Sequence, residues 1–245
     1  MALMTQIPFI GHHIAGFPAT SKALEDPNGL LAAGGDLEPE TLIEAYRRGI
    51  FPWYEADQPI LWWSPAPRAV FYPNTFKASK SLQKVLRKKT YRVTCDTAFT
   101  QVIKACSLPR PDSEGTWITS SMINAYIKLH QLGYAHSIET WSSTGELVGG
   151  LYGISLGSVF FGESMFSTHS NASKVAFCHL VDRCLQKDIK LIDCQVENPH
   201  LTSLGAIEIS RKTFEDHLSS YIASSDSLSI HQGCWSTTST IDSNS

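Results

Sequence analysis

Two acidic side chains lie in otherwise apolar segments of this sequence. Glu163 stands between phenylalanine and methionine side chains in the segment 160–167, and Asp193 precedes Gln195 in the strand-like segment 192–195. Burying a carboxylate among apolar side chains is costly, so such a residue needs a function or a partner that offsets the cost. Alternate residues of a strand face the same side, so Asp193 and Gln195 share a face. Together the two segments predict a pocket that binds an apolar group beside polar chemistry.

A second concentration of chemistry is basic. The segment 77–92 carries seven of the chain's 20 basic residues and no acidic residue. Helical spacing places Lys80, Lys84 and Arg87 on one face, with Lys88 beside them, while the apolar residues of the segment face the core. A solvated helix surface is the commoner explanation of such a stretch. The concentration of charge in an otherwise acidic chain favours instead a surface that contacts a phosphate backbone without reading its sequence.

A third motif is rejected on structural grounds. Gly153, Ser155 and Gly157 match the pattern G-x-S-x-G, and Asp193 and His200 follow in the order of a hydrolase triad. A nucleophile elbow requires a strand, a sharp turn and then a helix. The residues after Ser155 instead have the apolar pattern of a strand, so the glycines are predicted to form a hairpin turn and Ser155 is not a nucleophile.

Length and composition set the frame for these motifs. A chain of 245 residues, 42% of them hydrophobic, can form one domain, or one domain with a small appendage. The net charge of −3 indicates no nucleic-acid or membrane partner by itself. The six cysteines form no C-x-x-C pair and are typical of reduced, mostly buried thiols in a cytosolic protein. We expect no signal peptide, no membrane span and no metal site.

The helices and strands that position these residues are predicted from the spacing of apolar residues and from the prolines and glycines that end regular structure. Residues 1–67, rich in proline, glycine and tryptophan, predict a small N-terminal lobe with one helix that starts at Asp36 and ends at Gly49. Residues 68–222 alternate strand-like and helix-like segments, which predicts an α+β domain with a mixed sheet and helices on both faces. Residues 223–245 are rich in serine, threonine and aspartate and are predicted to be disordered.

Several longer segments carry a family resemblance. Together with the segments 160–167 and 192–195 they are DPNGLLAAGGD at 26–36, AYRRGIFPW at 45–53, WWSP at 62–65, GTWI at 115–118, AHSIE at 135–139, VGGLYG at 148–153, HL at 200–201 and SLGA at 203–206. In this order, and over about residues 7–216, the chain resembles the leucyl/phenylalanyl-tRNA–protein transferases.

The resemblance implies a reaction, a fold and partners. The reaction moves Leu or Phe, and also Met, from aminoacyl-tRNA to the N-terminal amine of a protein that starts with Arg or Lys, and marks that protein for N-end-rule degradation. The fold would be a small N-terminal domain followed by an acetyltransferase-like (GNAT) domain. The chain lacks the R/Q-x-x-G-x-G/A loop that binds coenzyme A, so no cofactor is expected. We expect a cytoplasmic monomer that does not bind membranes.

The resemblance also implies roles for the polar residues of the first two segments. Asp193 and Gln195 would act as a proton or electron relay at the amine. An aspartate is a weak base at its reference pKa of about 3.9, so an orienting role for Asp193 is an open alternative. Glu163 is the candidate that binds the cationic acceptor or its α-ammonium group.

The donor side chain requires an apolar slot. Each candidate residue for this slot could instead be an ordinary residue of the hydrophobic core. The candidates for this slot, taken from alternation and from the family pattern, are Leu151, Phe160, Met165, Phe177 and Ile192. Such a slot would exclude Val and Ile, which are stiff at Cβ. Tyr46, Trp53 and Trp117 are candidates for stacking on the terminal adenosine, and Lys80, Lys84, Arg87 and Lys88 for contacting the acceptor stem.

Two functions from other classes compete with this hypothesis. One is an acetyltransferase that uses acetyl-CoA, and the other is a non-catalytic module that binds tRNA or a peptide. Transfer of a labelled group from acetyl-CoA would identify the first. Binding that survives the loss of Asp193 and Glu163, with no turnover to lose, would identify the second.

Overall fold

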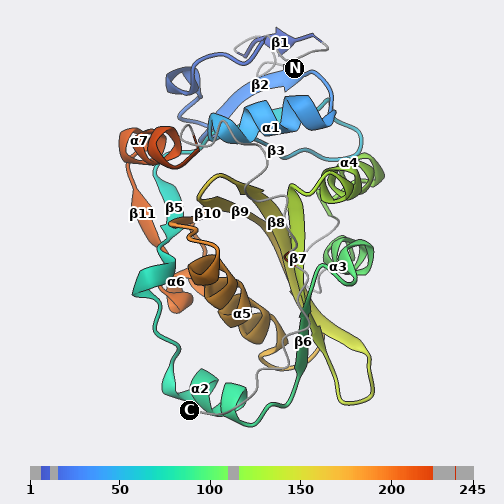
Figure 1. Ribbon diagram of the computed structural model, residues 1–245. Coiled ribbons are helices and arrows are strands. Elements are labelled where there is room, and N and C mark those ends of the chain that lie inside the picture. Colours follow the sequence, from blue (N-terminus) through green and yellow to red (C-terminus); the bar gives the residue numbers. More distant parts are fainter. Residues whose placement is uncertain (1–6, 12–15, 110–115, 223–234, 236–245) are drawn as a thin grey trace.

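The protein is built around two β-sheets, as the computed structural model in Figure 1 shows. The structure describes residues 7–11, 16–109, 116–222 and Trp235. The strands of the small sheet end at Trp63, and those of the large sheet begin at Arg68. The two prolines of the segment 64–67 stand between them, where regular structure is broken.

The small sheet has four strands in the order β1-β2-β4-β3. Its elements are β1 (Phe9–Ile10), a 3-10 helix (Thr20–Lys22), β2 (Leu30–Gly34), helix α1 (Pro39–Arg47), β3 (Phe51–Pro52) and β4 (Leu61–Trp63). Pro39 occupies the first turn of α1, where its missing N–H leaves no hydrogen bond unmade. Gly49 adopts a φ of 72°, the left-handed conformation that ends helices. The predicted N-terminal helix is therefore confirmed.

The large sheet has seven strands in the order β11-β5-β10-β9-β8-β7-β6. They are β5 (Arg68–Phe71), β6 (Arg92–Cys95), β7 (Ala135–Trp141), β8 (Leu147–Leu156), β9 (Val159–Ser167), β10 (Leu191–Gln195) and β11 (Ile207–Ile209). β10 is parallel to β9, and every other neighbouring pair is antiparallel. The sheet is thus mixed, and the predicted meander over β7, β8 and β9 is confirmed.

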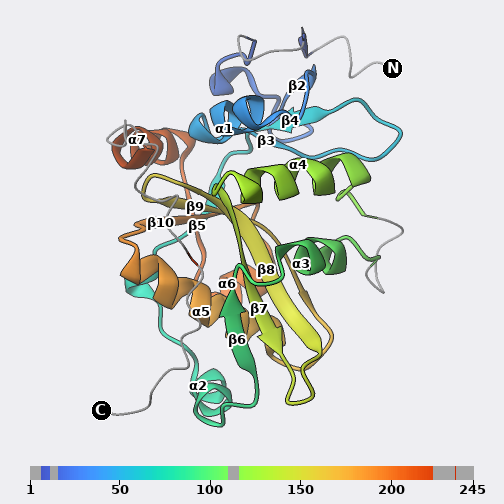
Figure 2. The ribbon, with the colours of Figure 1, turned by 45° about the vertical axis from the view of Figure 1, so that its right-hand side comes forward.

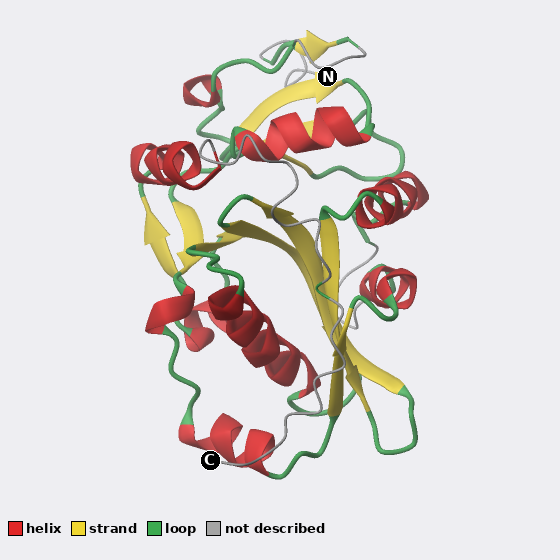
Figure 3. Ribbon diagram, viewed as in Figure 1, coloured by secondary structure: helices red, strands yellow, loops and turns green. Residues whose placement is uncertain are grey.

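Helices cover both faces of the large sheet (Figures 1 and 3). In chain order they are a 3-10 helix (Pro73–Thr75), α2 (Lys80–Arg87), α3 (Phe99–Cys106), α4 (Ser120–Gln131), α5 (Ala172–Gln186), α6 (Pro199–Leu204) and α7 (Arg211–Ile222). α3 and α4 lie on one face and α5 on the other, as the turned view of Figure 2 also shows. The core on the α3–α4 side also contains Leu42, Tyr46 and Trp62 of the small lobe. The predicted α+β class, with a mixed sheet and helices on both faces, is confirmed.

The segment that matches G-x-S-x-G forms a hairpin. Leu156 of β8 pairs with Val159 of β9, and Gly157 adopts a φ of 54° in the turn between them. Ser155 lies on β8 and is 3% exposed. The turn is followed by a strand, not a helix, so rejecting the hydrolase motif was correct.

Strands β9 and β10 pair over the first three residues of each and then separate, and this separation positions the site. Their parallel pairing runs from Leu191–Val159 to Asp193–Phe161. β9 continues beside β8 as far as Ser167, whereas β10 ends at Gln195. The residues just beyond this last pair, among them Glu163 and Gln195, are therefore not paired in the sheet across the two strands. They line the cavity described below.

Several sequence predictions concern the cysteines and the ends of the chain. The cysteines that the structure describes are free and buried, as expected; Cys234 lies outside the described residues. Burial raises the pKa of the Cys178 thiol to about 12. No helix within the described ranges is both long enough and apolar enough to cross a membrane. The predicted disordered segment lies outside the described residues, except for Trp235, which is 1% exposed.

We predict that Gly153→Ala lowers the free energy of unfolding by about 1–3 kcal/mol, the usual cost of overpacking a core. A Cβ atom at this position would lie 2.2 Å from the carbonyl oxygen of Phe161 and 2.6 Å from the ring of Phe160. Chemical denaturation measures the change. Gly11→Ala is the control, because its Cβ would meet no atom within 4 Å; equal stability of the two variants would contradict the prediction.

Candidate active site

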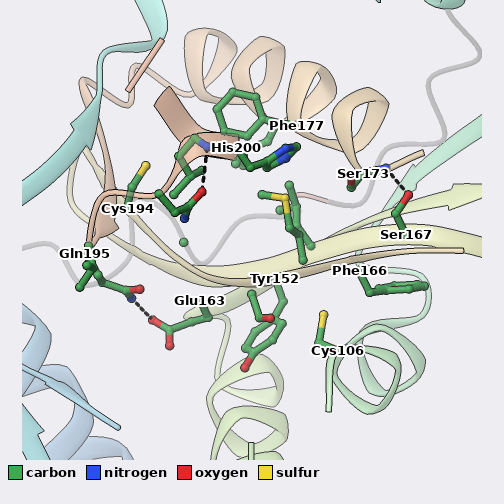
Figure 4. A pocket seen from close by; sticks show the side chains of 18 of the residues that line it. Cys106, Tyr152, Glu163, Phe166, Ser167, Ser173, Phe177, Cys194, Gln195 and His200 are labelled. Atoms are coloured by element: carbon green, nitrogen blue, oxygen red, sulfur yellow. Dashed lines mark hydrogen bonds between the residues drawn. The ribbon is translucent and has the colours of Figure 1, made fainter. Parts of the chain in front are cut away.

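A cavity of about 1200 Å³ opens where β9 and β10 part. Its lining comes from β8, β9 and β10, from α5 and α6, from the end of α3, and from β3 of the small sheet. Figure 4 shows Glu163 and Gln195 pointing toward one another on one side of it, with Phe177 on another. Both segments that the sequence singled out therefore meet in one cavity.

The apolar wall of the cavity contains all five residues predicted for the donor slot. Leu151, Phe160, Phe177 and Ile192 are buried, and Met165 is half-buried. They come from β8, β9, α5 and β10, and they pack in one cluster on the α5 face of the sheet. The structure thus brings together residues that lie up to 41 positions apart in the sequence.

Glu163 is the acidic group of the cavity, and it is 9% exposed. The hydroxyl of Tyr46 donates to Oε1 over 2.7 Å, and the hydroxyl of Tyr126 donates to Oε2 over 2.9 Å. Gln195 donates from Nε2 to Oε1 over 3.2 Å, the bond drawn in Figure 4. Burial raises the pKa of Glu163 from 4.5 to about 7, although the tyrosine hydrogen bonds oppose the rise. The carboxyl group can therefore take up or release a proton near neutral pH.

Asp193, on strand β10, forms an ion pair with the guanidinium group of Arg68. Its carboxylate accepts from Nε of Arg68 over 2.8 Å and from Nη2 over 2.7 Å. The side chains of Asp193 and Arg68 are 0% and 1% exposed. This bidentate geometry is the one that planar guanidinium groups favour. Asp193 thus has a buried partner that the sequence interpretation did not include.

The same carboxylate holds the end of β10. Oδ1 of Asp193 accepts the backbone N–H of Gln195 over 2.9 Å. Gln195 has a φ of 61°, in the left-handed region that non-glycine residues seldom adopt. The hydrogen bond that this N–H donates to Asp193 stabilises the conformation, and the Gln195 side chain contacts Glu163. Of the two roles left open for Asp193, this geometry favours the orienting one.

The three aromatic residues predicted to stack on a base differ in exposure. Trp53 is 45% exposed and Trp117 is half-buried, and both line the cavity. Tyr46 is 0% exposed, and its hydroxyl is 2.5 Å from that of Tyr126. A ring without an exposed face offers no surface for stacking on a base, and the Tyr46 hydroxyl instead contacts Tyr126 and Glu163 inside the protein.

The predicted basic helix is α2, and its charges face solvent. Lys80, Lys84, Arg87 and Lys88 are exposed, whereas Leu82 is buried against α5. The hydroxyl of Ser79 accepts the N–H of Leu82 and caps the helix. None of the residues of α2 lines the cavity, so this helix forms a separate surface.

The comparisons with known proteins place this chain. The model of the family "Leucyl/phenylalanyl-tRNA protein transferase" matches residues 70–219, and that of the family's N-terminal domain matches residues 35–66. A protein of that description from Cellvibrio japonicus is 55% identical over 212 residues, which cover 86% of this chain and 90% of the relative. One from Nitrosospira multiformis is 58% identical over 202 residues, with 82% and 87% covered.

The chain belongs to the leucyl/phenylalanyl-tRNA protein transferase family. The resemblance read from the sequence motifs is therefore confirmed. A solved structure, that of L-PGS from Bacillus licheniformis, is similar with a TM-score of 0.39 and 13% identity, over 69% of this chain and 53% of that one. This distant likeness adds nothing to the assignment of the transferase family.

In this transferase, sequence reasoning missed two residues that hold the polar groups, Arg68 and Tyr126, and one tyrosine that lines the cavity, Tyr152. From the sequence, no role is assigned to Arg68 or Tyr126, and Tyr152 stands only within the motif at 148–153. Tyr152 lines the cavity, and its hydroxyl is buried without a hydrogen-bond partner. For Arg68, the available signal in the sequence was a basic residue at the start of an apolar, strand-like segment. For Tyr126 and Tyr152 there was no signal, because both stand at positions that the apolar spacing assigns to the core.

The raised pKa of Glu163 predicts a pH dependence of stability. The folded chain binds this proton more tightly than the unfolded chain, so the unfolding free energy decreases as pH rises from 4.5 to about 7. The shift corresponds to a loss on the order of 3 kcal/mol. Glu163→Gln should remove this part of the dependence, which denaturation at several pH values measures. Glu146→Gln, at an exposed position, is the control; identical pH profiles for Glu163→Gln and the wild type would contradict the assignment.

Proposed function

We propose that this protein transfers Leu or Phe, and also Met, from aminoacyl-tRNA to the N-terminal amine of proteins that begin with Arg or Lys. The observation that carries the proposal is a buried carboxyl group, Glu163, which accepts three hydrogen bonds and lines a cavity with an apolar wall; burial raises its pKa to about 7. Family membership supports the donor and the reaction. The preference for Arg or Lys comes from the resemblance to the family.

The chemistry requires positioning and one proton acceptor. The ester that joins the amino acid to tRNA is already activated, whereas an α-amine with a pKa of about 8 is mostly protonated at neutral pH. Glu163, as a carboxylate, accepts a proton from the ammonium group. The free amine then attacks the ester carbonyl carbon, the new C–N bond forms, and the bond to the ribose oxygen breaks. The attacking nitrogen gives up one further proton and the ribose oxygen takes one up, so the ribose leaves with a hydroxyl group.

The polar residues around Glu163 position its carboxyl group. Tyr46, Tyr126 and Gln195 donate hydrogen bonds to its carboxylate and limit its rotation. Asp193 acts one step further away, because it fixes the backbone of Gln195 and is itself neutralised by Arg68. We assign Asp193 this orienting role.

The apolar wall supports the donor preference. Leu151, Phe160, Met165, Phe177 and Ile192 form a slot for a flexible or flat side chain. Val and Ile carry a branch at Cβ, close to the ester, and their stiff χ1 resists the turn into the slot. Trp53 and Trp117, at the cavity's edge, are positioned to stack on the terminal adenosine.

The same family patterns support a division of the chain into a small lobe over 1–67 and a catalytic domain over 68–222. The two matched family models, over 35–66 and 70–219, are separated near this boundary. The strands of the two sheets are divided at the same place. We assign α2 of the second part to the acceptor stem, and we assign the product to degradation in the cytoplasm.

Transfer of labelled Leu from its tRNA tests the reaction. Peptides that begin with Arg or Lys should be labelled and a peptide that begins with Ala should not. Glu163→Gln should lower kcat/KM by about 100-fold or more, the usual contribution of a positioned proton acceptor. Glu146→Gln is the exposed control. Label transfer from acetyl-CoA in place of Leu-tRNA would support the acetyltransferase alternative instead, and full activity of Glu163→Gln would contradict its role.

Binding of tRNA tests the surface of α2. Replacing Lys80, Lys84 and Arg87 together by Ala should weaken binding and reduce the slope of log K against log salt by about two to three, since fewer counterions are released. Lys212→Ala, on the exposed face of α7, is the control for a change in net charge. An unchanged salt slope in the triple variant would remove α2 from the tRNA-binding surface.

A further inference from the structure

One residue from the C-terminal end of the chain is buried in the large domain. Trp235 is 1% exposed, although it lies 13 positions beyond Ile222, where α7 ends. The matched family model ends at residue 219, so Trp235 lies beyond it. A fully buried indole from a terminal segment is unusual, because terminal residues are ordered only where something holds them.

Trp235 lies against residues of β7 and β9, the strands on either side of β8. Its ring stacks on that of His136, with centroids 4.5 Å apart and planes 14° from parallel. The ring of Phe160 is 5.4 Å away, at 33°. His136 on β7 is paired with Gly153 on β8, and the Phe160 ring lies over Gly153, where a Cβ would be 2.6 Å from it. The indole and the phenyl ring therefore lie side by side on the α5 face of the sheet.

Phe160 connects Trp235 to the cavity. Phe160 is 0% exposed and lines the cavity, whereas Trp235 does not line it. Both belong to the cluster that contains Leu151, Phe177 and Ile192. Close-packed cores do not leave room for a ring to move unless a neighbour is removed. Trp235 is one of the neighbours that hold the Phe160 ring in the wall, and it packs at the side of that ring.

We infer that Trp235 is a specificity-determining residue that sets the size of the donor slot, by packing beside Phe160 where that ring lies over Gly153. This inference rests on the proposed function, because the slot has a role only if it receives the side chain of the transferred amino acid. Removing the indole leaves a space beside Phe160, into which the ring can move and so deepen the slot. The donor that gains from the added depth is the one with the larger side chain.

The test compares donors of different size. Trp235→Ala should raise the ratio of kcat/KM for Phe over that for Leu by about tenfold, the discrimination that one added methylene makes in an apolar pocket. Trp235→Phe, which refills most of the space, should restore the wild-type ratio. Trp235→Leu gives the same information as Trp235→Ala, with a smaller change, if the alanine variant does not fold.

A matched variant separates specificity from stability. Ile189 is 2% exposed, belongs to the same cluster and does not line the cavity. Ile189→Ala should lower the melting temperature, as Trp235→Ala does, while the Phe-to-Leu ratio stays at the wild-type value. If Trp235→Ala and Ile189→Ala have the same Phe-to-Leu ratio while transfer is intact, the inference about Trp235 is overturned and the proposed function is not. Absence of transfer from either tRNA by the wild-type protein would overturn the proposed function, and the inference with it.

Discussion

The buried ion pair between Arg68 and Asp193 is the interaction on which the rest of this structure depends. Arg68 begins β5 and Asp193 lies on β10, so the pair joins two adjacent strands at the point where β10 leaves β9. The guanidinium group also packs on the rings of Phe51 and Phe214. It therefore joins the small sheet, the large sheet and α7 at one point. Removing either partner would leave an unpaired buried charge, which costs about 3–5 kcal/mol.

From this pair a chain of hydrogen bonds extends through Gln195 to the carboxyl group of Glu163. Asp193 fixes the left-handed backbone of Gln195, and Gln195 donates to Glu163. Two tyrosine hydroxyls complete the set of donors, one from α1 of the small lobe and one from α4. Burial raises the pKa of Glu163, and the donors prevent the pKa from rising further. These contacts suit Glu163 to the proposed role of proton acceptor for an amine whose pKa is about 8.

Apolar packing on the other face of the sheet serves a second purpose. The parting of β9 and β10 opens a cavity whose polar side is formed by Glu163 and Gln195 and whose apolar side is formed by the cluster under α5. Gly153 leaves room for the Phe160 ring to approach β8 closely, and Trp235 packs beside that ring and on His136 of β7. The shape of the apolar side is thus decided by packing partners that do not touch the cavity themselves.

The sequence by itself determined the class of the fold, the family and most of the cavity. Strand alternation, helical spacing and breakers predicted the mixed sheet, the meander and the hairpin at Gly157, because these patterns are local. Acidic residues in apolar segments identified Glu163 and Asp193, since an unexplained buried charge is conspicuous in any sequence. Only the tertiary structure decided which residue serves which purpose. Arg68 is 125 positions from Asp193, and Tyr46 is 117 positions from Glu163. Contacts over such distances depend on how strands and helices pack, and packing leaves no periodic signal in the chain.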